Sequence, residues 1–99
     1  SFAFNGYLPV DAEERARKLR DLEQRSRKAQ QTQVWIETPY RNGALLDALR
    51  QHCAGTTLLS IAVDLTLPTE AIVTLPIADW RPDRLPLHKR PAIFSLLAQ

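Results

Sequence analysis

The stretch Thr57-Leu58-Leu59-Ser60-Ile61-Ala62-Val63 decides how the fold is interpreted. It is nearly all apolar or β-branched, and no proline or glycine interrupts it. Continuous runs of this kind are typical of strands that are covered on both faces. We therefore predict a buried strand over Thr57–Val63, with the loop Asp64–Glu70 following it.

A long helix is predicted well ahead of this strand. From Ala12 to about Ala29 the chain has no proline or glycine and is rich in strong helix formers. Asp11 stands at the N-cap position, and Glu14 has the spacing of a capping box. The inward face is narrow, which is typical of a surface helix. It consists of Ala12, Ala16, Leu19, Leu22, Ser26 and Ala29.

A second helix is predicted over Asn42–Cys53, with Gly55 as its C-terminal stop. Its inward residues are Leu45, Leu46, Leu49 and Cys53. The other strands are predicted at Phe2–Leu8, Val34–Ile36, Ala71–Leu75 and Ala92–Leu97, and a single helical turn at Ile77–Trp80. Strands alternate with helices at first and then follow one another directly. The predicted fold class is therefore α/β, a mixed sheet of about five strands flanked by helices, in one domain over residues 1–99.

The composition indicates which cellular compartment and which kinds of partner to expect. The 99 residues are 44% hydrophobic and include one cysteine and no run long enough to span a bilayer, so we expect a cytoplasmic protein without a membrane partner. The net charge of +2 is too small to argue for nucleic acid, and DNA is not expected as a partner.

Seven of the thirteen Lys and Arg residues lie between Arg15 and Lys28. They could follow an RNA backbone. They could also form a solvated helix face, with charge pairs such as Glu14–Lys18 and Asp21–Arg25. We favour the second interpretation, because no aromatic side chains are interleaved to stack on bases.

Several kinds of active site are excluded. The three glycines are isolated, so there is no glycine-rich phosphate loop. One cysteine and two histidines cannot build a structural zinc site, and we predict no metal site. His52 and Cys53 diverge by about 100° on a helix, which makes a poor nucleophile and base pair. Asp64 and Glu70 could act as acid and base, but a loop-capping role is favoured. No catalytic residue is identified.

Four segments together resemble one family. They are Phe4–Pro9 with the basic helix after it, Ile36–Arg41, Asp64–Thr66 with Glu70–Ile72, and His88–Phe94. In this order they resemble the second domain of the tetrapyrrole-methylase superfamily, near the branch of the small-subunit ribosomal RNA ribose 2′-O-methyltransferase. Departures at Asp64, Thr69 and Arg90–Ala92 from that branch's usual residues point to a sister group.

The resemblance implies an S-adenosylmethionine-dependent methyltransferase with its cofactor in a cleft between two lobes. This chain would be the C-terminal lobe of the tetrapyrrole-methylase fold, with the N-terminal lobe missing. The absence of methionine, even at position 1, agrees with a domain taken from a longer protein. Cofactor contacts in such a lobe come from strand ends, as in other α/β crevices. Carried over by position, they are Ile36, Glu37, Thr38, Leu65, Thr66, Leu67, Pro91, Ala92 and Ile93.

Tyr40 and Arg41 are the side chains predicted to contact substrate. An arginine just beyond a strand end could hold a phosphate or a carboxylate with two hydrogen bonds. Arg41 could equally pair with Glu37, four residues earlier.

We therefore predict part of an enzyme that moves a methyl group to an oxygen, nitrogen or carbon atom, and expect the fragment alone to be inactive. The expected partners are its own N-terminal lobe, a second copy in a homodimer, and a small-molecule or RNA acceptor. The alternative is a non-catalytic α/β interaction or dimerisation domain.

Overall fold

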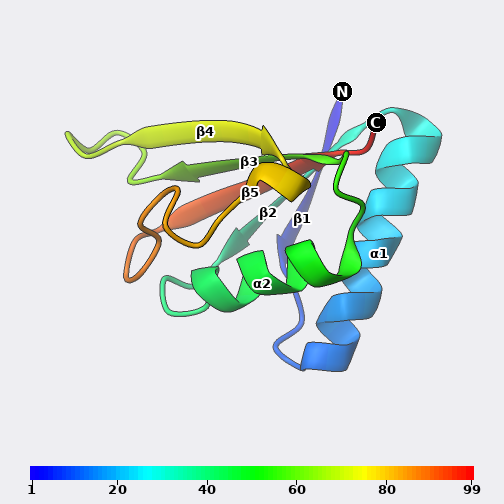
Figure 1. Cartoon of the computed structure of the whole chain (residues 1–99), viewed down its shortest axis with the longest axis horizontal. Coiled ribbons are helices and arrows are strands. Elements are labelled where there is room, and N and C mark those ends of the chain that lie inside the picture. Colours follow the sequence, from blue (N-terminus) through cyan, green and yellow to red (C-terminus); the bar gives the residue numbers. More distant parts are fainter.

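The chain forms a mixed sheet with the strand order β1-β2-β5-β3-β4, described by a computed structural model of residues 1–99 (Figure 1). The strands are β1 (Phe2–Tyr7), β2 (Thr32–Glu37), β3 (Leu58–Val63), β4 (Ala71–Pro76) and β5 (Ala92–Leu97). The helices are α1 (Ala12–Ala29), α2 (Asn42–His52) and the short 3-10 turn η1 (Ile77–Asp79). The predicted α/β class and every predicted element are confirmed, with shifts of a residue or two at the ends.

Strand directions create one edge where several chain segments meet. β1 and β2 are parallel, and β5 lies between β2 and β3, antiparallel to both. β4 is antiparallel to β3 at the far side. The carboxyl ends of β1, β2 and β3 therefore share an edge with the amino ends of β4 and β5. We call this the carboxyl edge.

The ends of the two helices are set by different local contacts. The Glu14 amide donates to Asp11 Oδ2 at 3.0 Å, as the capping spacing predicts, and α1 ends at Gln30 in a left-handed conformation with φ 50°. Helix α2 ends at Cys53, which is extended, so the prediction that Gly55 stops it is wrong. Gly55 is needed for a close approach instead, because a Cβ there would lie 3.0 Å from the Ala78 Cβ.

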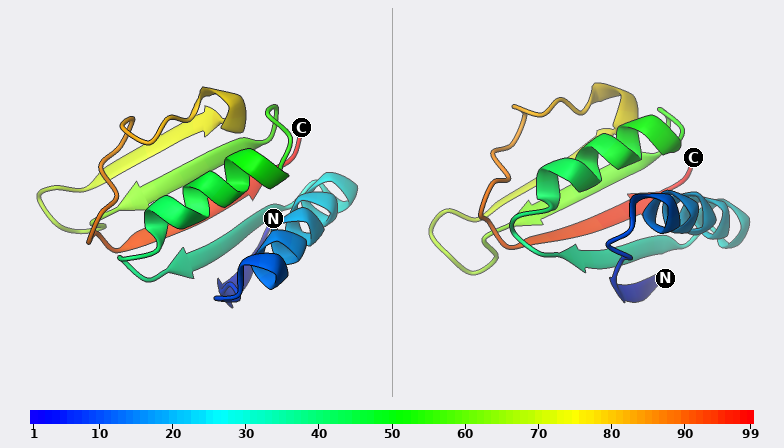
Figure 2. Two further views of the ribbon diagram at one scale, coloured as in Figure 1. Left: turned by 60° about the horizontal axis from the view of Figure 1, so that its bottom comes forward. Right: turned by 90° about the horizontal axis from the view of Figure 1, so that it is seen from below.

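Both helices lie on one face of the sheet (Figure 2). Alternate side chains of β2, β3 and β5 point toward them and are buried. Trp35 and Phe94 stack at the centre, with ring centroids 5.8 Å apart and planes 12° apart. Trp80 follows η1 and is fully buried, and its indole N–H donates to the Leu59 carbonyl at 2.9 Å. Neither α1 nor α2 combines the length with the hydropathy of a bilayer-spanning helix.

The other face of the sheet has no helix over it, and we call it the open face. The prediction that both faces of the Thr57–Val63 strand are covered is wrong, because only every second residue of β3 is buried. Register places only uncharged side chains on the open face. Its most exposed large hydrophobic members are Phe2, Tyr7, Ile72 and Phe4, at 69%, 65%, 62% and 61%.

Two polar side chains of α1 are buried and join distant parts of the chain. Glu23 Oε2 accepts from the Ala54 amide at 2.8 Å and from the Thr57 hydroxyl at 2.5 Å. Ser26 Oγ accepts from the Ala98 amide at 2.9 Å. Because buried polar groups require partners, these contacts fix α1 to both the α2–β3 connection and the end of β5.

The two buried tryptophans should respond differently to truncation. Trp80→Phe removes a hydrogen bond to Leu59, whereas the Trp35 indole N–H has no partner, so Trp35→Phe removes an unsatisfied donor. We expect Trp35→Phe to cost less free energy of unfolding than Trp80→Phe by about 1–2 kcal/mol. Urea denaturation of both variants measures this. An equal or larger loss for Trp35→Phe would contradict it.

Candidate functional site

A pocket of about 430 Å³ lies at the carboxyl edge. It is lined by Tyr7, Ile36, Glu37, Thr38, Pro39, Ala62, Asp64, Leu65, Leu67, Pro91, Ala92 and Ile93. Of the residues predicted to contact cofactor, all except Thr66 are in this lining. They meet because Ala92, at the start of β5, is paired with both Glu37 and Val63, at the ends of β2 and β3. The three predicted segments thus share one rim.

The floor of the pocket is a row of side chains that crosses the sheet. Ile93 pairs with Ile36 on one side and with Ala62 on the other, and Tyr7 pairs with Ile36. This row belongs to the open face. Leu65 and Leu67, from the loop after β3, form a wall beside it. The lining is thus mainly apolar with a few polar groups, as is usual in small-molecule sites.

Hydrogen-bonding groups at the rim are partly free. The Thr38 amide donates to its neighbour Glu37 Oε1 at 2.8 Å, and the Leu67 amide to the Asp64 carbonyl at 2.9 Å. The Leu65 amide and carbonyl make no hydrogen bond within the chain. No group of the chain therefore competes with a ligand for them. The Thr66 amide, in contrast, donates to Glu70 Oε1 at 2.9 Å, and Thr66 lies outside the lining.

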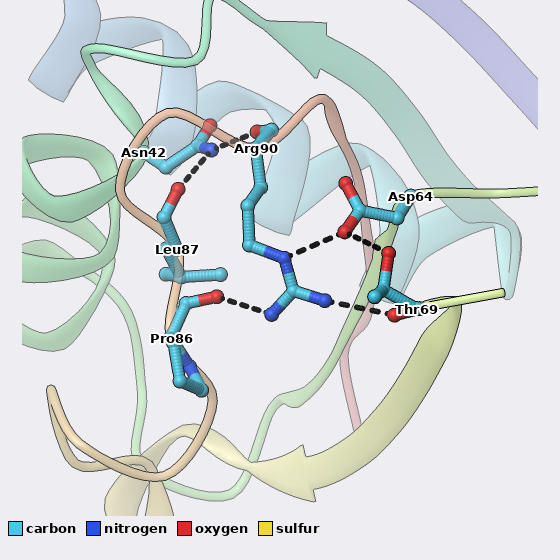
Figure 3. Close-up of polar contacts among 6 residues, drawn as sticks. All are labelled: Asn42, Asp64, Thr69, Pro86, Leu87 and Arg90. Atoms are coloured by element: carbon cyan, nitrogen blue, oxygen red, sulfur yellow. Dashed lines mark hydrogen bonds and ion pairs between the residues drawn. The ribbon is translucent and has the colours of Figure 1, made fainter. Parts of the chain in front are cut away.

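Asp64 is held by a network that Figure 3 shows. Its Oδ2 accepts from the Thr69 hydroxyl at 2.8 Å and from Arg90 Nε at 2.9 Å. The Thr69 hydrogen bond first, and then Arg90, keep the pKa of Asp64 below its ordinary value. Asp64 is thus ionised, with Oδ2 bound to both partners, and Glu70 is bound to the Thr66 amide, so both carboxylates have the loop-capping role that the sequence favoured.

Tyr40 and Arg41 lie outside the pocket. Arg41 Nη1 is 4.0 Å from Glu37 Oε1, which is the pairing that the sequence left open. Tyr40 is 74% exposed and lines a second depression of about 610 Å³, edge-on to His88 with ring centroids 6.3 Å apart. Pro39 lines both depressions, so the second lies next to the first.

The basic face of α1 carries internal charge pairs. Arg25 Nε lies 3.1 Å from Asp21 Oδ2, which confirms the predicted pair. The predicted Glu14–Lys18 pair is wrong, because Lys18 Nζ lies 4.0 Å from Asp21 instead. Asp21 is therefore paired with two cations, Lys18 three residues before it and Arg25 four residues after it.

Cys53 does not have the properties of a nucleophile. Burial, and secondly the charge of Glu23, raise the pKa of its thiol to about 12. No group of three or more His, Cys, Asp or Glu side chains could hold a metal ion.

Comparison with solved structures shows the fold alone: the chain is an α/β lobe similar to part of one methyltransferase structure. The crystal structure of the methyltransferase CobJ matches with a TM-score of 0.63 and 16% sequence identity. The match covers 99% of this chain and 41% of that one, so the chain spans less than half of the CobJ length. No family model and no curated protein matches the sequence. The predicted α/β fold with a mixed sheet of five strands agrees with this match, and the ribosomal RNA branch has no support from it.

The Cys53 thiol should react slowly in the folded protein. Its pKa of about 12, against an ordinary 9.0, leaves about a thousandfold less thiolate at pH 8. We expect iodoacetamide to label the folded chain at least about a hundredfold more slowly than the chain in urea, as followed by mass spectrometry. Cys53→Ser gives the background. Similar rates in both states would contradict this assignment.

The Asp64 carboxylate should stabilise the fold in a pH-dependent way. Because its folded pKa is lower than the ordinary 3.8, its contribution is present above that value and is lost as the pH falls through the folded pKa. Asp64→Asn should therefore lower the thermal midpoint by a constant amount from neutral pH to about pH 5, and the difference should disappear in stronger acid. Asp83→Asn, in an exposed loop, is the control. A difference that does not change with pH would refute the role of this charge.

Proposed function

We propose that the chain forms one half of an S-adenosylmethionine-dependent methyltransferase site, and that the pocket at the carboxyl edge receives the donor. The observation that carries the proposal is the meeting of Ile36–Thr38, Leu65–Leu67 and Pro91–Ile93 around one pocket. Segments far apart in the sequence reach it from two strand ends and one strand start. The likeness to a methyltransferase fold supports the same assignment.

The pocket fits a nucleoside donor in size and chemistry. Its volume of about 430 Å³ lies within the roughly 300–1,000 Å³ that is usual for small-molecule sites. The flat row of Ile36, Ile93 and Ala62 offers an apolar surface for a planar ring. The free amide and carbonyl of Leu65 can pair with the donor and acceptor groups on the edge of a purine.

Methyl transfer requires little acid–base or nucleophilic chemistry from the side chains of the protein. The cofactor, when bound, supplies the reactive methyl group, and the protein has to hold donor and acceptor in line and exclude competing water. The residues of the pocket agree with this division of labour. Asp64 is ionised and engaged with Thr69 and Arg90, and Cys53 is protonated and remote from the lining.

The site as we propose it is incomplete without a second lobe. The floor of the pocket belongs to the open face, which no other part of residues 1–99 covers. We propose that an N-terminal lobe of the same protein lies over this side and closes the cleft. A fragment of residues 1–99 should then bind the cofactor poorly and be inactive. Homodimerisation would bury more of the same apolar face.

The methyl acceptor is proposed to enter beside Tyr40. The second depression, which Tyr40 lines, adjoins the donor pocket at Pro39. Tyr40 and His88 contribute aromatic rings to its lining. Arg41 lines neither depression and is assigned to its pairing with Glu37. We propose a small molecule or an RNA nucleotide as the methyl acceptor. The more specific proposal for an RNA acceptor is a ribose of ribosomal RNA.

Calorimetry with S-adenosylhomocysteine tests the donor pocket. Ala62→Leu adds a side chain to the floor, and we expect it to weaken binding to the full-length protein by about tenfold or more. Ser60→Leu is the matched control, since Ser60 faces the same way on β3 but lies outside the lining. Equal affinities of the two variants would refute the pocket assignment.

The same measurement separates the proposal from the alternative of a non-catalytic interaction domain. The exposed Phe2, Phe4 and Ile72 favour that alternative, because exposed apolar patches mark partner surfaces. Binding by the full-length protein and little binding by residues 1–99 supports the shared cleft. No binding by either supports the interaction domain.

A further inference from the structure

We infer that Arg90 is the positioning residue of the carboxyl-edge pocket: it fastens the two loops that form the rim without itself touching the ligand. This inference rests on the proposed function. The loops are 64–70, which supplies Leu65 and Leu67, and 86–91, which supplies Pro91. Arg90 is not among the lining residues, so any effect on a ligand passes through these loops.

The guanidinium bonds to both loops at once. Nε donates to Asp64 Oδ2 at 2.9 Å, at the start of loop 64–70. Nη2 donates to the Thr69 carbonyl at 2.8 Å, near the end of the same loop, and Nη1 donates to the Pro86 carbonyl at 2.8 Å. Figure 3 shows the side chain extended between these three partners. One planar group thus joins both ends of one loop to the beginning of the other.

The contact is better protected than an ordinary surface ion pair. The Arg90 and Asp64 side chains are 22% and 10% exposed. Exposed pairs contribute little because they are solvated and mobile. Here three separate acceptors hold the guanidinium, and Asp64 is held in turn by the Thr69 hydroxyl. The arrangement requires the fixed fork of an arginine, which a lysine cannot reproduce.

A second set of hydrogen bonds holds the backbone of Arg90. Asn42, at the start of α2, is fully buried, and its Nδ2 donates to the Arg90 carbonyl at 2.7 Å and to the Leu87 carbonyl at 3.0 Å. The backbone of loop 86–91 is thereby attached to a helix of the core. Arg90 transmits this fixed position to loop 64–70 through its side chain.

Loop 64–70 needs such an anchor because its backbone is strained. Asp64 and Thr66 have φ values of 53° and 69°, in the left-handed region that non-glycine residues rarely adopt. Strained residues of this kind persist only where their surroundings fix them. The Leu65 backbone lies between them, and its free amide and carbonyl are those that we assign to the ligand. Holding Asp64 therefore orients the binding groups before the ligand arrives, which raises affinity by removing an ordering cost.

Amide hydrogen exchange, read by NMR on the full-length protein, tests the anchor without any ligand. In Arg90→Ala the Thr66, Leu67 and Glu70 amides should exchange at least about tenfold faster, while amides of α1 and β2 keep their rates. Arg90→Lys keeps the charge but loses the fork, and should give an intermediate effect. Arg81→Ala is the matched control, since Arg81 also donates to two carbonyls, those of Ala78 and Trp80, away from the pocket. Unchanged exchange in loop 64–70 overturns the inference.

Binding of S-adenosylhomocysteine to the same proteins completes the test. We expect Arg90→Ala to weaken binding by about tenfold and Arg81→Ala to leave it unchanged, with Arg90→Lys between them. If the wild type binds, and Arg90→Ala and Arg90→Lys bind with the same affinity, the positioning role is overturned but the proposed function is not. Absence of binding by the wild type overturns the proposed function, and with it any role of Arg90 in that site. General instability of Arg90→Ala would appear as faster exchange throughout α1. In that case the exchange and binding of Arg90→Lys decide whether Arg90 positions the loop.

Discussion

The insertion of β5 between β2 and β3 is the constraint on which the rest of the structure depends. β5 is antiparallel to both neighbours, so Ala92 lies beside Glu37 on one side and Val63 on the other. The chain must therefore return to the carboxyl edge before it enters its last strand. That return brings loop 86–91 against the loops that leave β2 and β3. Strand order and direction thus place the parts of the pocket that β2 and β5 supply, while Arg90 holds loop 64–70 beside them.

One-sided coverage of the sheet accounts for the buried core on one face and for the uncovered apolar surface on the other. α1 and α2 bury one face around Trp35 and Phe94, and polar anchors such as Glu23 fix them there. Nothing in residues 1–99 covers the other face, although its side chains are uncharged. The floor of the pocket belongs to this second face. The uncovered apolar surface and the floor of the pocket are therefore continuous, as the proposed cleft between two lobes requires.

Local sequence patterns were sufficient to predict the elements, and the family resemblance implied which strand ends would line one site. Helix α1 follows from Asp11 and a long stretch without proline or glycine, and β3 from an unbroken apolar run. Strand order could not be predicted in the same way, because pairing across the chain leaves no local periodicity. Tyr7 was therefore missed as part of the floor. Burial of Glu23 could not be predicted either, because glutamates are usually exposed and its partners Ala54 and Thr57 are brought to it only by the folded chain.

The two arginines near the pocket show where such reasoning ends. Arg41 is predicted to contact substrate because it follows a strand end and an aromatic residue, yet the same position gives it a partner, Glu37, four residues away. Arg90 is bound to Asp64 across twenty-six positions, and nothing in either local sequence indicates the contact. Both arginines are thus engaged within the chain. What the edge leaves for a ligand is apolar surface and the backbone of Leu65, held in place by groups that do not touch it. Such a site selects its ligand by shape and backbone hydrogen bonding, which suits a reaction that depends on alignment more than on acid–base chemistry.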